Sequence, residues 1–287
     1  MIDEGMGIVK VHDEVFIQSI DRKERIIRFL VSKLGINEVN ARDEKHASEI
    51  LSQLFREESP LLNDVEYDAE IFLDEWADDA SYMNSDEYRA PKTGIVNNSF
   101  YDRSKAKAYI DAYWKDYNPA YPSFHHGGGD CTNFISQVLH AGGMPWKDDG
   151  NPANHRNSRN WYCKPGATAK DYEKRITFSW KIAAVFKGHW IQRVEKHFIV
   201  NYSEIINGID YIFTEVHIGD VVQFCYSSGV PYHTLAVTGF NMDPEYNVRD
   251  IVLASHDIDS NNRSLYRTIL RFPGDYKLRV YIIKKGE

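Results

Sequence analysis

Helical patterns come first in this chain and strand patterns come last, and this order constrains the fold more than any other feature. Apolar residues recur at helical spacing in four early segments, at about 15–34, 43–57, 65–82 and 103–117. From residue 218 onward, short β-rich runs are bounded by Gly, Pro, Asn and Asp, at 221–226, 233–240, 251–255, 265–272 and 278–283. Helices followed by a run of strands predict an α+β fold rather than alternating βαβ units.

A polar stretch at residues 85–100, which contains Pro91 and Gly94, separates the first helical segments from the rest. We therefore predict a helical N-terminal region over 1–98 and a second domain over 99–287. The segment 64–82 is strongly acidic and contains no Lys or Arg. Such a charge run fits a solvated helix face, and it would also suit docking of a basic protein partner.

The composition argues against several classes of protein. Lys and Arg number 34 against 42 Asp and Glu, and the net charge of −8 disfavours a dedicated nucleic-acid or anionic-membrane binder. No apolar run approaches the roughly 20 residues that a membrane-spanning helix needs. The start of the chain lacks the pattern of a secretory signal, so as written it predicts a cytoplasmic protein or one exported by a non-classical route. The 3 cysteines are an odd number in a fairly large chain, which argues against a disulfide framework.

A glycine-rich turn at 127–129 leads into a short apolar helix that begins at Cys131. A cysteine in the first turn of a helix faces unpaired backbone N–H groups and the positive end of the helix dipole, which stabilise a thiolate. Because the thiolate is the attacking form, this placement suits a nucleophile. A small buried cysteine at the start of a core helix explains the local sequence equally well. We interpret Asp130 as a local cap or turn former.

Two histidines stand at matched ends of predicted strands. His233 opens the strand 233–240, and His256 follows the strand 251–255. If these strands are antiparallel neighbours, the start of one lies beside the end of the other, so the histidines would meet at one edge. A base and its orienting residue need this geometry. Either histidine taken alone is more simply read as structural.

The chain resembles the bacterial putative amidase domain family in the motif GDCTNFISQ at 129–137 and in AGGMP at 141–145. The similarity covers roughly 101–284 and continues through 161–162, 179–180, 219–221, 233–239 and 255–256. This family is related to the NlpC-type and CHAP-type cell-wall hydrolases. The resemblance implies a papain-like domain in which the cysteine-bearing helix packs on an antiparallel sheet. It also implies Cys131 as nucleophile, His233 as base, His256 as orienting residue, and peptidoglycan as the substrate class.

The expected reaction is acyl transfer. Cys131 attacks an amide carbonyl, and His233 protonates the leaving amine and then activates water. The backbone N–H of Cys131 is a candidate donor to the oxyanion, and Tyr121 is a second. Asp130 is also a residue of the predicted substrate site, and Trp161 could line a cleft that binds glycopeptides.

Neither a cofactor nor a metal is expected. His125 and His126 lie close to Cys131, but no His-Glu-x-x-His or Cys-x-x-Cys pattern accompanies them. Two other functions stay open beside hydrolysis of peptidoglycan. One is a toxin- or effector-type cysteine protease or deamidase that acts on a protein. The other is a non-catalytic cell-wall-binding relative that keeps the fold without the chemistry.

Overall fold

The structure, a computed structural model, describes residues 96–124, 130–169, 173–227, 229, 231–257 and 259–285. The three helices expected before residue 85, and the acidic stretch among them, lie outside the described residues. These features and the boundary at residue 98 therefore stay predictions. Among the described helices, none combines the length and the apolar character that crossing a bilayer requires.

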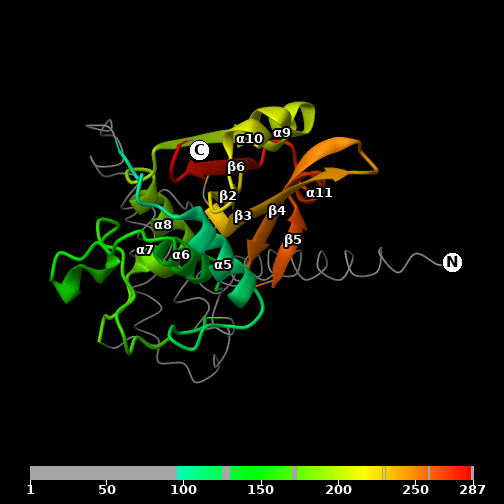
Figure 1. The fold of residues 1–287 in the computed structure, drawn as a ribbon. Helices are drawn as coiled ribbons and strands as arrows, with labels where there is room; N and C mark the ends of the chain where they lie inside the picture. Colours follow the sequence, from blue (N-terminus) through cyan, green and yellow to red (C-terminus); the bar gives the residue numbers. More distant parts are fainter. Residues whose placement is uncertain are drawn as a thin grey trace, which may run out of the picture. The chain divides into compact units, whose positions relative to one another are not determined.

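A six-stranded sheet in the order β1-β6-β2-β3-β4-β5 forms the centre of the described domain (Figure 1). All of its neighbouring strands pair antiparallel. The strands are β1 (Lys196–Asn201), β2 (Val221–Cys225), β3 (Pro231–Asp243), β4 (Val248–Ser255), β5 (Ser260–Ser264) and β6 (Lys277–Ile282). The α+β prediction is confirmed.

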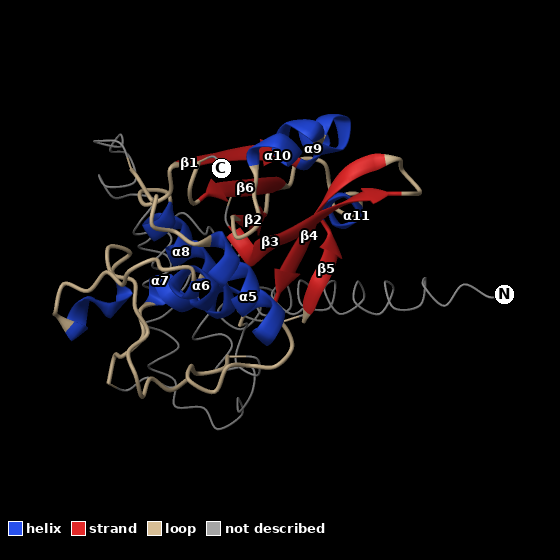
Figure 2. Ribbon diagram, in the orientation of Figure 1, coloured by secondary structure: helices blue, strands red, loops and turns tan. Residues whose placement is uncertain are grey.

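Helices cover both faces of this sheet (Figure 2). One face carries α5 (Arg103–Tyr113), α6 (Cys131–Ala141), α7 (Phe178–Lys181) and α8 (Ala183–Trp190), and a short 3₁₀ helix, η1 (Pro152–Arg156), contacts α7. The other face carries α9 (Tyr202–Gly208), α10 (Asp210–Glu215) and α11 (Leu265–Ile269). The segment 265–272 was predicted as a strand, and this prediction is wrong. A short apolar run does not by itself separate strand from helix, and here the side chain of Ser264 caps the N-terminus of α11 by accepting from the backbone N–H of Arg267.

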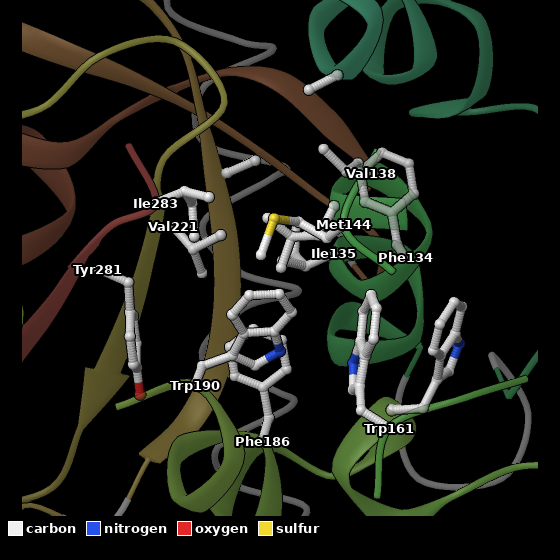
Figure 3. Close-up of a cluster of buried hydrophobic side chains, with 14 of the residues drawn as sticks. Phe134, Ile135, Val138, Met144, Trp161, Phe186, Trp190, Val221, Tyr281 and Ile283 are labelled. Carbon is white, nitrogen blue, oxygen red and sulfur yellow. The ribbon is translucent and has the colours of Figure 1, made fainter. Parts of the chain in front are cut away.

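Helix α6 is the centre of the core on its side of the sheet. Every residue from Cys131 to Leu139 is buried, because α6 lies between the sheet and the neighbouring helices α5 and α7. Figure 3 shows Phe134, Ile135 and Val138 of α6 beside Met144. Complete burial of one large apolar side chain stabilises a fold by about 1.5–3 kcal/mol. The core therefore holds α6 firmly, and with it the cysteine at its first position.

Candidate active site

Cys131 is the first residue of α6, as the sequence predicted. Its side chain is only 8% exposed, and its Sγ lies 3.7 Å from Oγ1 of Thr132. Cys163 and Cys225 are also buried, and all three cysteines are free thiols. Burial raises the pKa of Cys225 to about 11, so this thiol stays protonated at neutral pH.

A hydrogen bond between two threonines joins the N-terminus of α6 to the start of β3. Oγ1 of Thr132 lies 2.8 Å from Oγ1 of Thr234, and Thr234 also accepts a hydrogen bond from Nε2 of Gln223 at 3.0 Å. Thr234 therefore faces α6. Because His233 precedes Thr234 directly, its backbone lies at the same end of the sheet as Cys131.

His233 lies beside a β-bulge in β3. It pairs with Phe224 of β2 while Pro231 pairs with Cys225, so Tyr232 is the extra residue. The His233 ring is stacked toward the Phe224 ring, with 6.3 Å between centroids. The bulge interrupts the alternation of side chains along the strand, so the position of Thr234 does not assign a face to the neighbouring His233. Bulges commonly re-aim side chains next to active sites. The predicted pairing of Cys131 with His233 stays a prediction.

His256 forms a buried pair with Asp130. Its Nδ1 lies 2.6 Å from Oδ2 of Asp130, and its Nε2 lies 2.8 Å from the carbonyl oxygen of Tyr113. Both ring nitrogens of His256 therefore face oxygen atoms of the protein. The ring is stacked between Tyr117 and Phe134, each with a centroid distance of 4.0 Å.

The sequence predicted that His256 would orient His233, but both of its ring nitrogens are bonded to other groups. The strands β3 and β4 are antiparallel neighbours, as expected. Ala236 and Ala254 are paired and both pack into the core beside α6. His256 lies in the turn just after β4 and reaches Asp130 at the start of α6. The bonds of His256 therefore run to Asp130 and to Tyr113.

Asp130 does more than the local cap that the sequence predicted. Its side chain makes no capping bond to α6. Its Oδ1 instead accepts hydrogen bonds from the backbone N–H of Phe124 at 2.7 Å and from Nδ2 of Asn133 at 2.8 Å. Together with the bond to His256, these contacts tie the loop before α6, the first turn of α6 and the end of β4 to one carboxylate. The only sequence signal was an acidic residue next to an apolar helix.

Asp257 supplies the cap at the N-terminus of α6, and the sequence analysis missed it. Its Oδ2 accepts hydrogen bonds from the backbone N–H groups of Asp130 and of Cys131, the latter at 2.8 Å. The N–H of Cys131, which was predicted as an oxyanion donor, is therefore bonded to a carboxylate. Aspartate is a preferred capping residue, but capping is normally expected from a residue beside the helix in sequence.

The two predicted aromatic residues differ in position. Tyr121 is half-buried and stacked toward Trp180, with 5.9 Å between centroids, and burial raises the pKa of its hydroxyl. Its role as a donor to substrate stays a prediction. Trp161 is fully buried, and its Nε1 donates to Oγ of Ser136 at 3.1 Å. It lies in the core rather than on a cleft wall.

Within the part of the chain that the structure describes, no cluster of three or more His, Cys, Asp or Glu side chains could hold a metal ion. His125 and His126 lie outside the described residues. The described residues of the site supply a thiol, imidazoles, carboxylates and backbone amides.

Fold and site together define an α+β domain with a thiol at the tip of its central helix. The family model described as a putative amidase domain matches residues 100–283. The match covers most of the chain, and the chain belongs to this family. The family's description names an amidase, a class of enzyme that hydrolyses amide bonds.

A stretch of 87 residues, 30% of this chain, is 39% identical to the uncharacterized protein YhbB of Bacillus subtilis (strain 168). That stretch spans 23% of the length of YhbB, so the two chains are compared over a minor part of each. No solved structure gives a significant match to this chain.

Proposed function

We propose that this protein is a thiol-dependent hydrolase of papain-like type that cleaves an amide bond in peptidoglycan, with Cys131 as nucleophile and His233 as base. The observation that carries the proposal is the position of Cys131. It is the first residue of a buried helix, and the bond between Thr132 and Thr234 fixes the start of that helix to the strand that bears His233.

The helix start favours the reactive form of the thiol. The positive end of the α6 dipole lies at Cys131 and stabilises a negative charge there. Asp130, the residue before Cys131, is hydrogen-bonded to His256. The thiolate would attack the amide carbonyl and form a thioester, releasing the amine. Water would then hydrolyse the thioester and restore the thiol.

The bonds of His256 favour His233 as the base. Both ring nitrogens of His256 already contact oxygen atoms of Asp130 and Tyr113, so neither is free to contact the sulfur of Cys131. Proton transfer requires a ring nitrogen of His233 within about 3 Å of the sulfur, directly or through one water. Such contacts often tighten only when substrate binds, and the bulge at Tyr232 is the local irregularity that would allow the ring to turn.

Support for peptidoglycan as the substrate comes from the resemblance of the motif around Cys131 to cell-wall hydrolases. The test is to incubate the full-length protein with purified peptidoglycan and to identify released fragments by mass spectrometry, because the fragment masses name the bond. We expect soluble fragments from the wild type and none from Cys131→Ala or Cys131→Ser. Cys163→Ala, which removes another buried thiol, should keep the activity.

Three outcomes would each contradict one part of the proposal. If Cys131→Ala cleaves peptidoglycan as fast as the wild type, Cys131 is not the nucleophile. If Cys131→Ala releases no fragments but His233→Ala is fully active, Cys131 is the nucleophile and His233 is not the base. If the wild type releases nothing from peptidoglycan but cleaves or deamidates a protein, the substrate assignment is wrong and the thiol chemistry stands.

A further inference from the structure

We infer that Asp257 occupies, in the free protein, the backbone N–H groups that would bind the carbonyl oxygen of the substrate, so that substrate has to displace this carboxylate before Cys131 reacts. The inference rests on the proposed role of Cys131 as nucleophile. It adds that a carboxylate of the protein itself blocks the site, a property that does not follow from assignment to the amidase family.

The contact is specific to the reacting end of α6. Oδ2 of Asp257 accepts from the N–H of Asp130 and from the N–H of Cys131, with 2.8 Å for the second bond. Asp130 itself leaves these amides open, because its side chain bonds to Phe124, Asn133 and His256. One carboxylate oxygen from a distant part of the chain therefore takes both donors.

A carboxylate oxygen at this position imitates the intermediate of the reaction. When a thiolate attacks an amide, negative charge develops on the former carbonyl oxygen, and donors 2.7–3.1 Å from that oxygen stabilise it. The bond from the N–H of Cys131 to Asp257 falls within that range. The charge of Asp257 also repels a thiolate at Cys131. Both effects keep the nucleophile unreactive while Asp257 stays in place.

The backbone at Asp257 has an uncommon conformation. Its φ is 70°, in the left-handed region, which few residues other than glycine adopt and in which Asp and Asn are enriched. Asp257 lies two residues beyond the end of β4, outside the ladder of the sheet, and its side chain is only partly buried. A conformational cost at a residue that contacts the reactive group is a pattern typical of functional positions.

The experiment measures the rate at which iodoacetamide alkylates Cys131 in the folded full-length protein, followed by peptide mass spectrometry. Asp257→Asn removes the charge and keeps an oxygen that can cap α6, and Asp257→Ala removes both. Asp259→Asn is the matched control, because it makes the same change of charge while its carboxylate bonds to the hydroxyl of Tyr117 at 3.0 Å. Alkylation of the buried Cys163 and Cys225 in the same samples reports unfolding.

We expect alkylation of Cys131 about tenfold faster in both Asp257 variants, because a charge-assisted bond to these amides is lost. The alkylation rate of Cys131 in Asp259→Asn should stay within about twofold of the wild-type rate, because solvent ions screen the effect of a more distant charge. Rates at or below that of the wild type in Asp257→Asn, with unchanged labelling of Cys163, would overturn the inference. Faster alkylation without any amide hydrolysis by the wild type would support the block by Asp257 and contradict the proposed function.

Discussion

The buried ion pair between Arg103 and Asp220 joins α5 to the start of β2, and its contribution to the free energy of unfolding can be tested quantitatively. Arg103, the first residue of α5, donates from Nη1 to Oδ1 of Asp220 at 2.9 Å and to the carbonyl of Ile218 at 2.8 Å. The side chains are 12% and 0% exposed. Asp220 also accepts from the backbone N–H groups of His217 and Ile283. Replacing Arg103 by Met would leave this carboxylate buried without its cation.

The magnitude follows from burial. Removing one partner of a buried ion pair destabilises a protein by about 3–5 kcal/mol. Burial raises the pKa of Asp220 from its usual 3.8 to about 6, and Arg103 opposes this rise. The folded state therefore binds the proton more tightly than the unfolded state. The wild type loses about 3 kcal/mol of stability from this group as the pH rises from about 4 to 6.

Loss of Arg103 raises the pKa of Asp220 further, so the carboxyl group of the variant stays protonated to higher pH. The loss in free energy of unfolding caused by Arg103→Met is then largest at pH 8, at about 3–5 kcal/mol. At pH 5, where Asp220 is mainly protonated in both folded proteins, it falls to less than about half of that. Urea unfolding at both pH values, followed by tryptophan fluorescence, measures the two deficits.

The matched control is Lys105→Met, in the same helix. Lys105 lies 3.6 Å from Asp102 and is 70% exposed, so its loss should change the free energy of unfolding by no more than about 1 kcal/mol. The reasoning would be refuted if Arg103→Met lowered the free energy of unfolding no more than Lys105→Met does. It would also be refuted if the loss caused by Arg103→Met were the same at pH 5 and pH 8.

Two further predictions concern packing around α6. His256→Ala should lower the free energy of unfolding by about 3–5 kcal/mol, because it leaves Asp130 buried without its partner. His256→Gln should lower it less, because the Gln amide can still donate to Asp130. Equal losses for the two variants in urea unfolding would argue against the buried pair. Gly142→Ala should cost about 1–3 kcal/mol, because its Cβ would overlap the ring of Tyr101. Gly208→Ala, where the same atom meets open space, should change stability by less than about 1 kcal/mol, and similar effects at both glycines would contradict this packing.

Local patterns in the sequence were enough to predict much of this domain. The α+β class, the start of α6 at Cys131 and the antiparallel pairing of β3 with β4 agree with the structure. Each depends on neighbouring residues, through apolar periodicity and turn-forming glycines, prolines and asparagines. The error at 265–272 has the same origin, because a short apolar run carries no period that separates a strand from a helix.

The partners of the site residues were decided only by the tertiary structure. Asp130 and His256 are 126 positions apart in the chain, and their bond requires that His256 fall on the face of the sheet that α6 covers. Strand periodicity tells which residues share a face, but not which helix packs on it. For the same reason the sequence placed His256 beside His233, whereas the packing of α6 directs His256 to Asp130 and brings Asp257 onto the amides of Cys131.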